Sequence, residues 1–274
     1  MKEQSWSVVA VVCVSLLLLA SGPAKADDAA VSAPAANAPT NAPANPDVVK
    51  DWHGNVALGL SLANGNSSAY AVNAGAALDK EWKKDEWHFA VNGQYSVSNP
   101  DRNDQDITAE NAHGVVNYRH LFNDRFYAYG GEEVVHDDVA DVTYRFITSP
   151  GLGYYLVKEP TNRLRLEGGP SWIYERLSGA DPKHNNYIAA RVAERGEHDF
   201  NKNAKCWEQV EYLAKVDDWG NYLLNAEVGA EALINSVFSL RLVARDQYNS
   251  EPPVGSKSND ITVVGALVYK FGPQ

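Results

Sequence analysis

Apolar and polar residues alternate most regularly between residues 221 and 247, and this alternation predicts a β-hairpin. In the first arm the even positions are apolar, and they are Tyr222, Leu224, Ala226, Val228, Ala230 and Ala232. The pattern resumes at Phe238 and continues to Ala244. Because successive side chains of a strand point to opposite faces, each arm presents one apolar face and one charged face.

The charged face of this hairpin carries Glu227, Glu231, Arg241 and Arg245. We predict that Glu231 faces Arg241 and that Glu227 faces Arg245, directly or one diagonal step away, within reach of an ion pair. In a soluble sandwich the charged face would meet water. In an outer-membrane barrel it would meet a polar lumen, while the apolar face meets lipid. The hairpin alone does not separate these two environments.

The same alternation recurs between Trp52 and Phe271 in about twelve segments, each bounded by turn residues, which predicts a strand for each segment. Pro170 falls inside one of these segments and predicts a β-bulge, because proline cannot donate a ladder hydrogen bond. Beyond the N-terminus no apolar run is long enough for a membrane-spanning helix, so a membrane would be crossed by strands.

The connections between the predicted strands alternate in length. One set is generally short, at residues 122–125, 158–162, 199–203 and 234–236. The other set is generally longer and acidic, at residues 99–106, 137–141, 178–184, 217–218 and 250–260. The short loop 64–66 and the longer turn 79–86 are exceptions. Short turns at one end and longer loops at the other are typical of a transmembrane barrel whose loops lie outside the cell.

Aromatic residues stand near the predicted strand ends, where amphipathic rings prefer the membrane interface. They are Trp82, Trp87, Tyr118, Phe126, Tyr154, Trp172, Trp219, Tyr222, Tyr269 and Phe271. The alternative is that they form the ordinary core of a soluble barrel, which also has no open strand edges. We predict an all-β fold, a closed antiparallel transmembrane β-barrel of about twelve strands.

The N-terminus has the three parts of a secretory signal peptide, namely Lys2, an apolar run over residues 8–20, and an A-x-A cleavage site at residues 24–26. An uncleaved anchor is the alternative, although the run is shorter than the roughly 20 residues that span a bilayer. Residues 27–47 are nearly all Ala, Pro, Asn, Ser and Thr, which is typical of a solvated linker. We therefore predict a signal peptide over residues 1–26, a periplasmic tether over 27–50 and a barrel over 51–274.

The formal net charge of the chain is −11, and removal of the leader, whose net charge is +1, leaves −12. Such a balance argues against a nucleic-acid partner. Cys206 is the one cysteine outside the leader, so we expect neither an internal disulfide nor a cysteine metal site.

Little in the sequence indicates catalysis. The seven histidines are scattered without a neighbouring serine at catalytic spacing, and no G-x-S-x-G motif occurs. We expect no enzyme activity, no cofactor and no metal site, with an outer-membrane hydrolase as the weaker alternative. The acidic loop cluster could hold Ca²⁺ or Mg²⁺ weakly, but such charge runs are usually solvated faces; it comprises His136, Asp137, Asp138, Asp141, Asp217 and Asp218.

Charged residues on the polar side of the strands are the candidate lumen-lining groups. They are Arg145, Arg163, Arg165, Glu167, Arg191, Glu227, Glu231, Arg241 and Arg245, accompanied by Glu175 and Arg195. In an open lumen, rings of fixed charge set ion selectivity. In a closed lumen the same residues would form paired ladders that fill a narrow barrel. The sequence leaves both possibilities open.

Several short motifs occur in an order that resembles a known family. They are residues 59–62 with Gly65 and Asn66, and residues 151–154, 166–170, 211–213 and 239–242. Over about residues 51–271 the chain resembles the YdiY-like family of salt-induced outer-membrane proteins with a domain of unknown function. The resemblance implies an outer-membrane β-barrel of a Gram-negative bacterium whose biochemical task is unassigned.

The last strand also resembles the assembly signal of such barrels, although Phe271 is followed by three further residues. The partners implied are outer-membrane lipid, lipopolysaccharide and the barrel-assembly machinery, with the oligomeric state open. The function expected is a narrow pore or an envelope-integrity protein under salt or osmotic stress. The alternative is a surface binding protein that uses the acidic loops.

Overall fold

The computed structural model describes residues 52–63, 69–98, 106–178, 183–252 and 258–272. The predicted signal peptide over residues 1–26 and tether over residues 27–50 lie outside these ranges. Among the described residues no helix is long and apolar enough to cross a membrane.

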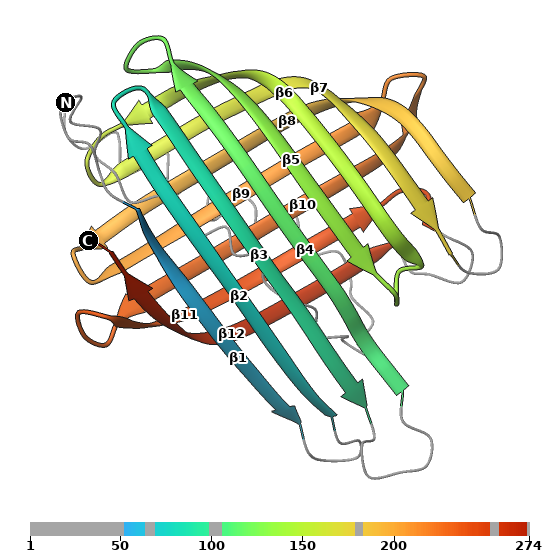
Figure 1. The fold of residues 1–274 in the computed structure, drawn as a ribbon, viewed down its shortest axis with the longest axis horizontal. Coiled ribbons are helices and arrows are strands. Elements are labelled where there is room, and N and C mark those ends of the chain that lie inside the picture. Colours follow the sequence, from blue (N-terminus) through green and yellow to red (C-terminus); the bar gives the residue numbers. More distant parts are fainter. Residues whose placement is uncertain (1–51, 64–68, 99–105, 179–182, 253–257, 273–274) are drawn as a thin grey trace.

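Twelve antiparallel strands form one closed barrel, in which each strand pairs with its neighbours in sequence and β1 pairs with β12 (Figure 1). The strands are β1 (His53–Ala63), β2 (Ala69–Trp82), β3 (Asp85–Ser98), β4 (Asp106–Leu121), β5 (Phe126–Asp137), β6 (Val142–Lys158), β7 (Asn162–Leu177), β8 (Lys183–Asn201), β9 (Ala204–Lys215), β10 (Asp218–Leu233), β11 (Phe238–Asn249) and β12 (Asn259–Phe271). The predicted fold class is confirmed.

The β10–β11 hairpin has the predicted register, with Glu231 opposite Arg241 and Glu227 opposite Arg245. Its two faces meet different surroundings, because Leu242 is 57% exposed whereas Glu231 is 4% exposed. The apolar face is therefore the outside of the barrel and the charged face is its interior. This is the reverse of a soluble sandwich, in which the apolar face would be the core.

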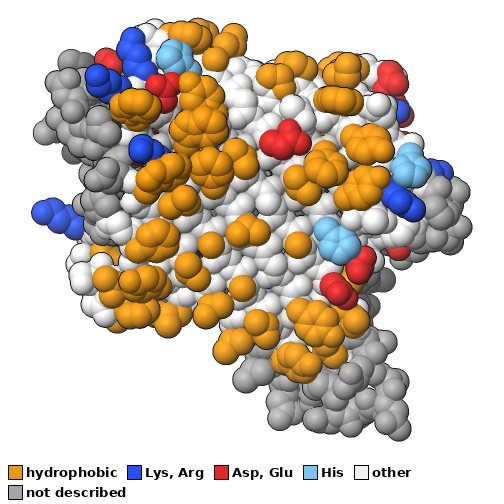
Figure 2. Space-filling view, viewed as in Figure 1, with side chains coloured by type: hydrophobic (Ala, Val, Ile, Leu, Met, Phe, Trp, Pro, Cys, Tyr) orange, Lys and Arg blue, Asp and Glu red, His pale blue; other side chains and the backbone are white. Residues whose placement is uncertain are grey.

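The outer wall carries many exposed apolar side chains. Figure 2 shows apolar side chains spread over one face of the barrel, with most charged side chains toward its ends. Large exposed residues include Leu58, Leu60, Val91, Trp172, Val192 and Val263. So many large apolar side chains exposed on one surface mark contact with a membrane or a partner rather than with water.

Aromatic rings cluster at both ends of this wall. At the short-turn end, Trp87 contacts Tyr118 with ring centroids 4.8 Å apart, and Phe238 contacts Tyr269 at 5.5 Å. At the loop end, Tyr222 contacts both Tyr212 and Tyr248. Rings in these positions suit two membrane interfaces separated by hydrocarbon.

Two local predictions were wrong. The turn expected over residues 79–86 comprises only residues 83–84, because β2 and β3 remain paired as far as Trp82 and Asp85. Lys83 has a φ of 52°, a conformation that tight hairpin turns require. This end of the barrel therefore keeps its short turns.

The β-bulge expected at Pro170 is also absent. Pro150 and Pro170 lie opposite each other, and the β6–β7 register is the same on both sides of them, as Thr148 with Trp172 and Leu152 with Gly168 show. The two prolines remove hydrogen-bond donors without shifting the strands. A buried hydrogen bond of 2.6 Å between the Ser149 and Ser171 hydroxyls joins the strands at this point.

Candidate functional site

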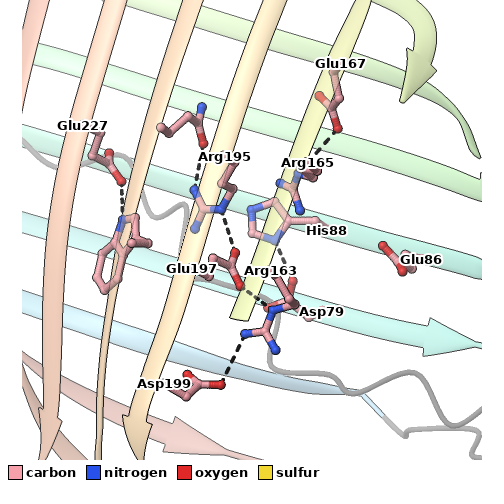
Figure 3. Close-up of polar contacts among 12 residues, drawn as sticks. Asp79, Glu86, His88, Arg163, Arg165, Glu167, Arg195, Glu197, Asp199 and Glu227 are labelled. Atoms are coloured by element: carbon pink, nitrogen blue, oxygen red, sulfur yellow. Dashed lines mark hydrogen bonds and ion pairs between the residues drawn. The ribbon is translucent and has the colours of Figure 1, made fainter. Parts of the chain in front are cut away.

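The candidate charges all project into the barrel interior, where they pair with one another. Arg145 pairs with Glu175 at 2.6 Å, Arg241 with Glu231 at 2.8 Å and Arg245 with Glu227 at 2.5 Å. Figure 3 shows Arg163 and Arg195 turned toward Glu197, at 2.9 and 2.8 Å. Whether these residues select ions stays a prediction, but their arrangement is a ladder of pairs rather than an open ring.

Glu167 is the centre of a cluster that we call the waist, formed with Arg119, Arg165, Arg191 and Tyr127. The Glu167 carboxylate accepts hydrogen bonds from Arg119 Nε at 3.3 Å, Arg191 Nη1 at 3.2 Å and the Tyr127 hydroxyl at 3.0 Å. Arg165 Nε lies 3.7 Å away. Because Arg119 belongs to β4 and Glu167 to β7, three strands along the barrel, these bonds cross part of the lumen.

Two tyrosines of β5 support the waist by lying flat against glycines of β6. A Cβ on Gly153 would lie 2.2 Å from the Tyr127 ring, and one on Gly151 would lie 2.5 Å from the Tyr129 ring. Only glycine leaves this space. The position of the Tyr129 ring allows Arg191 Nη1 to donate a 2.9 Å hydrogen bond to its hydroxyl.

A large cavity, the vestibule, lies at the loop end of the barrel. It has a volume of about 1180 Å³, and its lining includes Arg145, Glu175, Tyr187, Lys215 and Leu223. Arg145, Glu175 and Lys215 bring charge to it. Tyr187 and Leu223 pack against a buried apolar cluster of Ile147, Ile173, Ala189 and Leu213. The vestibule therefore combines charged groups with an apolar surface.

Two much smaller cavities occupy the interior. One has a volume of about 100 Å³ and is lined by β4, β5, β6, β8, β9, β10 and β11, while the other, of about 60 Å³, is lined by β3, β4, β7, β8 and β9. Three residues line both cavities, namely Asn117, Arg191 and Gln209. Each cavity holds only a few water-sized molecules, since one water occupies about 30 Å³ in the liquid.

The inward positions of β1, β2 and β3 form a contrasting surface that we call the neutral wall. Its buried residues include Asn55, Ala57, Asn73, Ala77, Asn92 and Gln94. Among the described side chains of this wall, charge occurs only toward the short-turn end, where His88 pairs with Asp79 at 2.6 Å and Glu86 lies 3.7 Å from Arg119. Arg241 of β11 donates a 3.4 Å hydrogen bond to Asn55, so a long side chain from the charged strands reaches this wall.

Sequence reasoning missed the residues that complete the waist. Nothing in the sequence indicates that Arg119 and Tyr127 contact β7 or that Tyr129 contacts β8. The pairing of glycine with an aromatic residue on neighbouring strands, as in Gly153 opposite Tyr127, is the one signal that could have found them.

The acidic loop residues belong to or flank two connections, β5–β6 and β9–β10. Asp138 is 3.6 Å from His136 and Asp217 is 3.5 Å from Lys215, on different loops. Within the described part of the chain, no group of three or more His, Cys, Asp or Glu side chains is placed to hold a metal ion.

Comparisons with known proteins begin with the family. Residues 56–271 match the family described as "Protein of unknown function, DUF481". A curated relative, the "Uncharacterized protein YdiY" of Escherichia coli (strain K12), is 24% identical over 208 residues, which cover 74% of this chain and 77% of that protein.

Solved structures with a similar shape include an outer-membrane channel, COG4313 of Pseudomonas putida F1, at a TM-score of 0.48 and 10% identity, covering 82% of this chain and 96% of that one. The NanC porin has a TM-score of 0.47 and 10% identity, and the match covers 81% of this chain and 100% of the NanC chain. The family resemblance expected from the sequence motifs is confirmed. With most of its length matched, the chain belongs to the DUF481 family of proteins of unknown function.

Proposed function

We propose that this protein is a narrow, charge-lined pore in the outer membrane of a Gram-negative bacterium. Its apolar wall would face lipid, with lipopolysaccharide around the loop end, and the barrel-assembly machinery would insert it. The conduit would pass small ions and small polar solutes and exclude larger ones. This function requires no enzyme activity.

Polar cavities arranged in series inside an apolar wall are the observation that carries this proposal. The vestibule opens at the loop end, and the two smaller cavities share the lining residues Asn117, Arg191 and Gln209. The shared residues have long or polar side chains, so rotamer changes there could connect the two cavities. The pairing of the lumen charges supports a small conductance, because a permeating ion must compete with bonds that the charges already make.

Single-channel recording in planar bilayers tests the proposal. Wild type should show a small conductance, and Arg191→Ala should raise it because truncation joins the two small cavities. The control is Arg145→Ala, which removes an interior arginine at the vestibule and should leave conductance nearly unchanged. Absence of conductance in wild type and in Arg191→Ala at every voltage would contradict the pore and favour a purely structural role.

A second candidate function is the binding of a surface ligand in the vestibule. The volume of about 1180 Å³ and the mixture of charged and apolar lining residues favour it. Ligand screening with wild type and with Tyr187→Ala would test it. Binding of equal affinity in the two proteins would exclude the vestibule as the ligand site.

The link to salt or osmotic stress rests on the family resemblance alone. A deletion strain should grow more slowly than its parent at raised osmolarity, and expression of the wild-type gene should restore growth. Equal growth of the two strains would remove this part of the proposal.

A further inference from the structure

The smaller interior cavity has an unusual lining. Four arginines surround its volume of about 60 Å³, namely Arg119, Arg165, Arg191 and Arg195, together with His88, Asn117 and Gln209. Glu167 and Glu194 are the carboxylates among the lining residues, so the four arginines outnumber them. Figure 3 shows Arg165, Arg195 and His88 directed into the same part of the interior, from β7, β8 and β3.

The carboxylates that balance the other arginines lie behind this lining. Glu197 bonds Arg195 Nε at 2.8 Å and Glu211 bonds Arg191 Nε at 2.6 Å, yet neither carboxylate lines the cavity. Each guanidinium has five N–H donors and no acceptor. The surface that faces the cavity is therefore rich in positive charge and in hydrogen-bond donors.

Arg165 is the least well paired of the four. Its Nε lies 3.7 Å from Glu167, beyond the range of a good hydrogen bond. The Glu167 carboxylate is meanwhile shared with Arg119, Arg191 and the Tyr127 hydroxyl. A buried guanidinium is costly unless its charge is closely paired, and a small anion would supply both charge and acceptors.

We infer that this cavity binds one small inorganic anion, with chloride as the probe, held by Arg165 and the neighbouring arginines. The volume leaves room for a single monatomic or similarly small ion and excludes organic acids and sugars. The site goes beyond the proposed pore, because an anion could bind here whether or not the barrel conducts. An anion in this place would complete the charge balance of the waist.

Chloride binding is measured on the purified full-length mature protein in detergent. Broadening of the chloride NMR signal by wild type should be reversed by nitrate and unaffected by gluconate, which is too large for the cavity. Thermal unfolding should also occur at a higher temperature in chloride than in gluconate at equal ionic strength, since a ligand of the folded state stabilises it. If wild type causes no broadening of the chloride signal and shows no difference in unfolding midpoint between the two salts, the proposal is overturned and water is the occupant.

Arg165→Gln removes the weakly paired cation and should weaken chloride binding by about tenfold or more, as expected for the loss of a hydrogen bond to a charged group. The matched control is Arg163→Gln, two residues away on the same strand. Arg163 pairs with Glu197 at 2.9 Å and Asp199 at 3.5 Å and does not line the cavity. This variant should keep its chloride response.

Equal chloride affinity in wild type and Arg165→Gln would place the anion elsewhere and overturn the assignment. If Arg165→Gln does not fold, Arg165→Lys keeps the charge but loses the planar fork, and it should bind chloride more weakly than wild type. Unchanged affinity in a folded Arg165→Lys variant would overturn the role of Arg165. Conductance is a separate measurement, so failure of the pore and failure of the anion site are distinguishable.

Discussion

The neutral wall of β1–β3 and the charged strands β6–β11 meet the same surroundings outside the barrel but differ inside it. Both present apolar residues outward, as Leu58 on β1 and Leu242 on β11 show, at 61% and 57% exposure. Inward, the neutral wall carries alanines and amides, whereas β6–β11 carry arginine and glutamate pairs. The surrounding hydrocarbon constrains one face of every strand, while the interior face is free to differ.

The difference indicates how a barrel of this width is filled. Long charged side chains extend from the charged strands, and the short side chains of the neutral wall leave space for them, as Arg241 of β11 reaching past β12 to Asn55 of β1 illustrates. Because the long side chains end in paired charges, the filling depends on ion pairs more than on apolar packing. Loss of a charge should therefore cost far more than loss of a neutral wall amide.

The largest expected effect is from Glu231→Leu. Glu231 is buried and pairs with Arg241 at 2.8 Å and Lys270 at 2.5 Å, so its removal leaves buried cations without their partner. The free energy of unfolding should fall by about 3 to 5 kcal/mol. Urea titration of folding into lipid vesicles measures it, and a loss below about 1 kcal/mol would contradict the importance of pairing.

Gly153→Ala should have the next largest effect. The added Cβ would lie 2.2 Å from the Tyr127 ring, so the ring and its hydrogen bond to Glu167 must shift. We expect a loss of about 1 to 3 kcal/mol in the same titration. Gly114→Ala is the control, because nothing lies within 4 Å of the added atom there. Equal losses of stability in the two variants would show that the position of the Tyr127 ring does not depend on a glycine at residue 153.

On the neutral wall, Asn73→Leu should be neutral or stabilise the protein by up to about 1 kcal/mol, the opposite sign to Glu231→Leu. The Asn73 amide atoms are buried and make no hydrogen bond among the described residues. Replacing such a group by an apolar one of similar shape removes a desolvated polar group. If Asn73→Leu destabilised the barrel as much as Glu231→Leu, the contrast between the two walls would fail.

The smallest effect should come from Lys215→Ala at the vestibule. Lys215 lies 3.5 Å from Asp217, whose side chain is 72% exposed, so water already screens this pair. We expect a change of about 0 to 1 kcal/mol. A loss of stability comparable to that of Glu231→Leu would mean that ion pairs at the vestibule stabilise the barrel as much as ion pairs in the interior.

The strand pattern could be predicted from sequence because an apolar exterior imposes a period of two on every strand. Pairing of Glu231 with Arg241 followed from adjacency within one hairpin. The contact of Arg119 with Glu167 could not be predicted, since it joins strands three apart and depends on Tyr127 lying against Gly153. Pro170 was misjudged because its effect depends on Pro150 across the ladder, which the order of residues along one strand does not reveal.

Accessibility of nitroxide labels tests the orientation of the barrel wall most directly. Cys206 is first replaced by Ser, and single cysteines are introduced at Leu240, Arg241, Leu242 and Val243 for labelling in lipid vesicles. Labels at residues 240 and 242 should collide with oxygen dissolved in the bilayer, while labels at 241 and 243 should not. The reverse alternation, or equal collision at all four positions, would contradict an apolar exterior around a charged interior.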